Sequence, residues 1–217
     1  VIEEIVELRR MGFRFIALAD DNFYPVTLDD LKMAARREDK TKYHELKALR
    51  DERFELMALM AQLPSDLNFF TQITMEAAED AEFLGAMTNA HIRGALVGVE
   101  AVTAAGLKDV YKDFNLAGDE LMERLKLFKK SGVHILGSFI FGLPSDGPST
   151  FAATAELAKK ADITMAQFLM LTPFPGTLDF DKWERETGGD MPTVDGIPVS
   201  RYWLFPWAKR PKLLTPH

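Results

Sequence analysis

The chain has 217 residues, a formal net charge of −7 and no cysteine. Its acidic balance, with a pI near 5.2, argues against nucleic acid as a main partner. No apolar run reaches the roughly 20 residues that a membrane-spanning helix needs. Without cysteine the chain forms no disulfide and no thiolate metal site, which fits a cytoplasmic location.

The first predicted elements are a helix, a short strand and a long helical region. Residues 1–12 carry an apolar stripe that ends at Gly12, and residues 13–19 form an apolar strand. Thr27 or Asp29 caps a helical region that extends to residue 63. Its charged middle, residues 36–42, predicts a break or a solvated face.

Two more strands follow. Residues 67–73 predict a strand that leads to Gln72, and Thr74 is expected to cap a helix over residues 75–87. Residues 93–99 predict a strand that ends in Glu100. A helix is expected over residues 115–130.

The stretch 133–146 predicts a strand buried on both faces, because apolar, β-branched and aromatic residues dominate it. Gly142 and Pro144 end this strand, and Asp146 is placed to cap a helix over residues 149–160. A glycine turn at the carboxyl end of a buried strand is where α/β folds bind ligands. The turn is therefore a candidate ligand site.

A fifth strand is expected over residues 164–171, followed by Thr172 and a proline-rich turn. From residue 179 onward the sequence predicts an irregular tail. Strands and helices thus alternate along the chain, which indicates a parallel sheet with helices outside it. A βα barrel or part of one fits best, because polar residues follow nearly every strand; a doubly wound open sheet is the second choice.

Several polar residues allow a functional and a structural interpretation. Asp20 or Asp21 could bind an ammonium group or a metal, or form an Asx turn and a helix cap. Glu100 ends an apolar strand and is expected to have a specific partner, which could be a ligand, the start of the following helix, Arg93 or Lys108. His134 is expected to be structural, because a single imidazole without companion ligands has little affinity for metal.

Taken together, the strand ends resemble the radical S-adenosylmethionine superfamily, especially the subgroup with a cobalamin-binding domain upstream. The five segments that carry the resemblance, in order, are Leu18-Ala-Asp-Asp-Asn-Phe23, Phe70-Thr-Gln72, Val97-Gly-Val-Glu100, Gly137-Ser-Phe-Ile-Phe-Gly-Leu-Pro144 and Leu171-Thr-Pro-Phe-Pro-Gly-Thr177.

The resemblance implies a partial (β/α)6 barrel of parallel strands over residues 1–183, with its first strand missing, and an irregular extension over residues 184–217. It implies an enzyme that reductively cleaves S-adenosylmethionine at a [4Fe–4S] cluster to begin radical chemistry on a small-molecule substrate. Cobalamin-dependent methyl transfer is one such reaction. Flavodoxin or ferredoxin would supply the electron.

Position by position, the resemblance also implies roles for ten residues around the cofactor. Asp20, Asp21 and Asn22 match the motif that binds the methionine amino group, a cation suited to anionic and carbonyl acceptors. Glu100 matches a residue near the ribose or the methionine carboxylate. The remaining matches are Gln72, facing substrate or cofactor, Ser138, Ile140 and Gly142, flanking adenine, and Leu171 and Thr172, at the adenine edge.

Two departures from the family pattern stand out. Ser145 occupies a position where many members have Glu. The Cys-x-x-x-Cys-x-x-Cys loop that ligates the cluster is missing. Since the chain begins with Val1, we expect the first strand, this loop and a cobalamin-binding domain to lie upstream, so that the chain alone binds no cluster.

Two other functions stay open from the sequence. One is a non-catalytic barrel that binds a nucleoside-like ligand. The other is an unrelated metal-dependent βα-barrel enzyme that uses Asp20, Asp21 and Glu100. No residue is identified as catalytic, and the substrate cannot be read from the sequence.

Overall fold

The computed structural model describes residues 1–109, 118–172, 176–186, 193–194 and 197–198. The chain forms two compact units, Val1–Met170 and Leu171–His217. No helix within these described ranges is long and apolar enough to cross a membrane.

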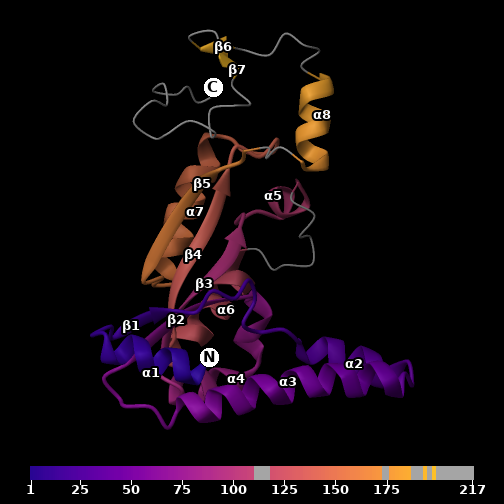
Figure 1. The fold of residues 1–217 in the computed structure, drawn as a ribbon. Coiled ribbons are helices and arrows are strands. Elements are labelled where there is room, and N and C mark those ends of the chain that lie inside the picture. The colour runs from indigo at the N-terminus through magenta and orange to yellow at the C-terminus, as the bar shows by residue number, and fades with distance from the viewer. Residues whose placement is uncertain (110–117, 173–175, 187–192, 195–196, 199–217) are drawn as a thin grey trace. The chain divides into compact units, whose positions relative to one another are not determined.

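The first unit is built on a sheet of five parallel strands in the order β1-β2-β3-β4-β5 (Figure 1). The strands are β1 (Phe15–Ala17), β2 (Asn68–Ile73), β3 (Ile92–Glu100), β4 (His134–Phe141) and β5 (Met165–Met170). The spatial order follows the chain order without a reversal, whereas a doubly wound sheet reverses at its switch point. The expected partial barrel is therefore confirmed, and the doubly wound sheet is not.

Eight helical segments of the described residues accompany this sheet. They are α1 (Ile2–Arg10), α2 (Leu28–Arg36), α3 (Lys40–Met60), the 3₁₀ helix η1 (Met75–Glu79), α4 (Ala81–Asn89), α5 (Ala104–Asp109), α6 (Gly118–Lys130) and α7 (Pro148–Lys160). Residues 115–117 of the predicted helix 115–130 lie outside the described ranges.

The two faces of the sheet differ because successive side chains of a strand point to opposite sides. In β2, Phe69, Thr71 and Ile73 are buried, and α4 and α6 contact the neighbouring strands β3 and β4. Gln72 lies on the other face and is exposed. We call this second side the concave face; register assigns to it Phe15, Ala17, Phe70, Gln72, Gly94, Leu96, Gly98, Leu136, Ser138, Ile140, Gln167 and Leu169.

Glycine leaves room for an aromatic ring at one position of the concave face. A Cβ atom on Gly94 would lie 2.9 Å from Cδ2 of Phe70, closer than side-chain carbons approach one another. The aromatic ring therefore occupies the space that a side chain at position 94 would need.

The helical region predicted from residue 27 to residue 63 is divided into α2 and α3. Thr27 caps α2, with its Oγ1 accepting the N–H of Asp30 at 3.0 Å. Glu38, in the gap between the helices, has a φ of +55°, which no helix residue adopts. The break expected within residues 36–42 is thus present.

The prediction of a helix over residues 75–87 is wrong about where the helix begins. Residues 75–79 form η1, and α4 begins only after Asp80, whose Oδ1 accepts the N–H of Phe83 at 3.0 Å. Thr74 makes no side-chain cap hydrogen bond. A carboxylate is the stronger acceptor at a helix N-terminus, so Asp80 rather than Thr74 sets the start of the helix.

In the second unit, α8 (Leu178–Glu186) corrects the expectation of an irregular chain from residue 179. The side chain of Thr177 accepts the N–H of Phe180 at 3.2 Å at the start of this helix. Strands β6 (Thr193–Val194) and β7 (Ile197–Pro198) pair antiparallel.

Candidate functional site

The five strands run parallel, so their carboxyl ends lie at one edge of the sheet. This edge brings together the predicted site residues of the first unit: Asp20, Asp21 and Asn22 follow β1, Gln72 and Glu100 lie at the ends of β2 and β3, and Gly142 follows β4. Ser138 and Ile140 lie deeper, on the concave face of β4.

The loop after β1 is held by hydrogen bonds of its own side chains. The N–H of Asn22 donates to Oδ1 of Asp20, and the N–H of Tyr24 donates to Oδ1 of Asn22, each over 3.1 Å. The N–H of Phe23 donates to the carbonyl of Gln72 at 2.7 Å, which joins the loop to the end of β2. The Asx turn, one of the two interpretations left open for this pair of carboxylates, is therefore present at Asp20.

Helix α3 supplies a cation to this loop. Nη1 of Arg53 lies 2.8 Å from Oδ2 of Asp20, and the guanidinium lies 4.3 Å above the centre of the Phe23 ring. Asp21 is exposed and has no side-chain hydrogen bond or ion pair with the residues that the structure describes. Of the two adjacent carboxylates, Asp21 is thus the one open to a ligand.

A second arginine of α3, Arg50, stabilises the same loop through Asp80. Nη1 of Arg50 lies 2.6 Å from Oδ2 of Asp80, and the hydroxyl of Tyr24 donates to the same oxygen at 3.0 Å. Burial favours the neutral form of Asp80, but the hydrogen bonds from Arg50 and from the N–H of Phe83 outweigh it and lower the pKa of the carboxyl. Burial, together with the charge of Asp80, raises the pKa of Tyr24.

Glu100 has an unusual backbone for its residue type. Its φ is +65°, a left-handed value that costs a residue with a Cβ on the order of 1–3 kcal/mol. The N–H of Ala101 donates to the carbonyl of Val99 at 2.9 Å and closes a γ-turn around Glu100, next to an irregularity in the pairing of β3 with β4. Strain of this kind is concentrated at functional sites.

The turn after β4 is closed by Asp146, which corrects the expectation that this residue caps the following helix. The N–H groups of Gly142 and Leu143 donate to Oδ2 of Asp146, at 2.8 and 3.0 Å. Helix α7 instead has Gly147 as its N-cap and Pro148 as its first residue, where a missing N–H costs nothing. Gly142 has a φ of +93°, a value that favours glycine.

The sequence did not indicate Gln167 as a site residue. It pairs in register with Ser138 on the concave face, where Ser138 is 7% exposed. No hydrogen bond of either side chain joins it to another described residue. The period-2 pattern of the strand that contains Gln167 was the signal that could have identified it.

The other predicted positions have different surroundings. Leu171 and Thr172 directly follow β5, are exposed, and belong to the second unit, so they are not counted with the site of the first. Nδ1 of His134 lies 3.1 Å from Oγ1 of Thr164, and this contact is structural. The described residues contain no group of three or more metal-ligating side chains that could hold a metal ion.

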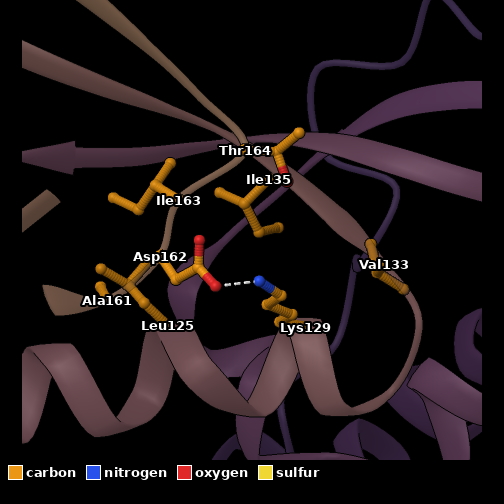
Figure 2. Close-up of a pocket in the computed structure, with 8 residues that line it drawn as sticks. All are labelled: Leu125, Lys129, Val133, Ile135, Ala161, Asp162, Ile163 and Thr164. Carbon is orange, nitrogen blue, oxygen red and sulfur yellow. Dashed lines mark hydrogen bonds and ion pairs between the residues drawn. The ribbon is translucent and has the colours of Figure 1, made fainter. Parts of the chain in front are cut away.

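A small hollow lies at the opposite edge of the sheet. Figure 2 shows it between α6, the start of β4 and the segment before β5, with Lys129 and Asp162 paired across it. Its position at the amino ends of the strands separates it from the polar edge, and it carries no part of the candidate site.

Comparisons with known proteins agree with this architecture. No family model matches the chain. An uncharacterized methyltransferase of Pyrococcus horikoshii is 39% identical over 80 residues, which is 37% of this chain and 17% of the relative. The hopanoid C-2 methylase of Rhodopseudomonas palustris is 25% identical over 120 residues, 55% of this chain and 23% of that protein. The chain thus spans less than a quarter of the length of either relative.

Two solved structures share the fold. The radical S-adenosylmethionine methyltransferase TsrM of Kitasatospora setae, solved with cobalamin and a [4Fe–4S] cluster, matches 87% of this chain and 32% of its own with a TM-score of 0.62 at 17% identity. The cobalamin-dependent radical enzyme OxsB matches 87% of this chain and 25% of its own with a TM-score of 0.54 at 14% identity. The predicted resemblance is thus confirmed in the fold: the first unit has the barrel fold of these radical S-adenosylmethionine proteins.

Proposed function

We propose that this chain forms the S-adenosylmethionine-binding barrel of a radical S-adenosylmethionine methyltransferase that acts on a small molecule. One observation carries the proposal: a single edge of a parallel half-barrel brings together the open carboxylate of Asp21, Glu100 with its strained backbone, and a glycine turn at Gly142. The similarity to methylating enzymes over parts of the chain supports the same reaction class.

The polar side chains at this edge of the sheet suit the chemical groups of the cofactor. The carboxylate of Asp21 suits the ammonium group of the methionine moiety. The carboxylate of Glu100 suits the two ribose hydroxyls or a position near the methionine carboxylate. The loop backbone fixed by Asp20, Asn22 and Gln72 holds Asp21 in place for this contact.

The turn after β4 suits the adenine. Ile140 offers an apolar contact on the concave face, and the exposed backbone at Gly142, which carries no side chain of its own, allows close approach. Ser138, with Gln167 beside it, offers a hydroxyl and an amide to cofactor or substrate.

When bound at a reduced cluster, the cofactor supplies radical or methyl-transfer chemistry. The thiolate ligands for a [4Fe–4S] cluster are not among the 217 residues, since the chain has no cysteine. The part that we assign to this chain is therefore to bind and orient the cofactor. A cobalamin-binding domain, a flavodoxin or ferredoxin reductant, and a cytoplasmic location complete the proposal.

Binding of S-adenosylhomocysteine to the full-length protein, measured by calorimetry, tests the proposal. We expect D21N and E100Q each to weaken binding by about tenfold or more, since a hydrogen bond to a charged group contributes about 1.5–3 kcal/mol. The matched control is E45Q, because Glu45 is a surface residue of α3 whose one ion pair among the described residues is with Lys42. Absence of binding to the wild-type protein contradicts the proposed function.

A further inference from the structure

The adjacent carboxylates Asp20 and Asp21 have different surroundings. Both oxygens of Asp20 are engaged, Oδ2 by Arg53 at 2.8 Å and Oδ1 by the N–H of Asn22 at 3.1 Å. The side chain of Asp21 is exposed, and among the described residues it has neither an ion pair nor a hydrogen bond. The two residues therefore do not act as a pair of equivalent ligands.

Arg53 is fixed in the position that produces this difference. Its side chain is 21% exposed, belongs to α3 and stacks over Phe23, two residues beyond Asp21 in the same loop. A guanidinium held by a carboxylate and by an aromatic face keeps a defined orientation. The loop consequently presents one net negative charge rather than two.

A single negative charge selects the kind of ligand. A divalent cation such as Ca²⁺ takes about six to eight oxygen ligands, with carboxylates among them. An ammonium group is satisfied by one carboxylate and a few neutral acceptors. The arrangement of Arg53, Asp20 and Asp21 matches the second case.

We propose that Arg53 is a positioning residue that neutralises Asp20 and thereby keeps Asp21 free to bind the ammonium group of an aminocarboxylate ligand. This inference rests on the proposed function, in which that ligand is S-adenosylmethionine. It assigns Asp20 to the architecture of the loop and Asp21 to the ligand.

The proposal makes an unusual prediction about the loss of Asp20. In D20N the Asn side chain still accepts the N–H of Asn22, but Arg53 loses its counterion. We expect its guanidinium then to pair with the adjacent open carboxylate, Asp21, and to compete with the ligand. Removing the cation as well, in D20N/R53Q, frees Asp21 again.

The test compares two probes on the full-length protein by calorimetry. S-adenosylhomocysteine carries the aminocarboxylate, and 5′-methylthioadenosine lacks it. For S-adenosylhomocysteine we expect D20N and D21N each to weaken binding by about tenfold, and D20N/R53Q to return to within about threefold of wild type. The double variant D21N/R53Q should still bind S-adenosylhomocysteine weakly. For 5′-methylthioadenosine, none of these variants changes the affinity by more than about twofold.

The outcomes separate the two claims. If the wild-type protein binds S-adenosylhomocysteine but D20N/R53Q stays as weak as D20N, the role of Arg53 is overturned and the proposed function stands. Loss of binding of both probes in D20N, with an unchanged urea midpoint, indicates a collapsed loop and also overturns it. If the wild-type protein binds neither probe, the proposed function itself fails, and the role of Arg53 fails with it.

Discussion

Arg50 and Asp80 form an ion pair whose guanidinium and carboxylate side chains are only 11% and 3% exposed, with Nη1 and Oδ2 separated by 2.6 Å. The pair joins α3 to the start of α4, and through the hydroxyl of Tyr24 it also holds the loop after β1. The edge of the sheet that carries the candidate site is thus tied to the core by buried charges.

Loss of one partner of this pair should be costly. We expect D80N to lower the free energy of unfolding by about 3 kcal/mol, because it leaves the buried charge of Arg50 with the exposed carboxylate of Glu82 as its remaining partner among the described residues. Urea unfolding measures the change. The control is E82Q, since the Glu82 side chain is 79% exposed and its pairing with Arg50 should contribute less than about 1 kcal/mol. Equal effects of the two variants would contradict the burial argument.

The same carboxylate predicts a dependence of stability on pH. The pKa of Asp80 is lower in the folded protein than its ordinary value of 3.8, despite the opposing effect of burial. Its contribution to stability is therefore fully present above about pH 4 and is lost as the pH falls through the lower, folded-state value. Urea midpoints between pH 5 and pH 2.5 should fall less steeply in D80N than in the wild-type protein. If the urea midpoints of the two proteins fell in parallel with pH, other groups would dominate the loss of stability in acid.

The left-handed backbone of Glu100 predicts a difference between two small substitutions. E100G and E100A both remove the carboxylate, but only glycine adopts a φ of +65° without cost. We expect E100G to be more stable than E100A by about 1 kcal/mol, a difference of a few degrees in melting temperature. Both variants should bind S-adenosylhomocysteine equally weakly. A more stable E100A would indicate that the turn relaxes when the carboxylate is removed.

Exposed apolar side chains on the two edge strands predict self-association of the 217-residue chain. Phe15 of β1 is 63% exposed, and Met165 and Phe168 of β5 are each 54% exposed. Edge strands with apolar side chains pair readily with other chains. Light scattering should show species larger than a monomer, and F15K with F168K should reduce them. A monomer at high concentration would contradict this expectation.

A chain without cysteine should bind no iron–sulfur cluster. After incubation of the 217-residue chain with iron, sulfide and a reductant, we expect no broad absorbance of a [4Fe–4S] centre. Appearance of that absorbance would require ligands other than thiolates.

Much of the fold followed from local patterns. The apolar stretch that became β4 and the glycine turn at Gly142 were predicted because strand ends and turns leave a strong local signal. Helix α8 was missed among prolines and tryptophans, although Thr177, with its side chain at the cap, was a usable start signal.

The arrangement of the site was harder to predict than its residue types. Arg53 is 33 residues from Asp20 along the chain and reaches it only because α3 packs beside the loop. Gln167 and Ser138 become neighbours only through the register of β4 and β5. Nothing local in the sequence shows such contacts, since they depend on how distant elements pack.

The two arginines of α3 also limit how this helix can vary in length. Each residue of an α-helix turns the chain by 100°, so one residue inserted between Arg50 and Arg53 would rotate one guanidinium away from its carboxylate. The first turns of α3, which are exposed, face no such restriction. Insertions and deletions should therefore be tolerated near Lys40 and rejected within the single turn that contacts both Asp20 and Asp80.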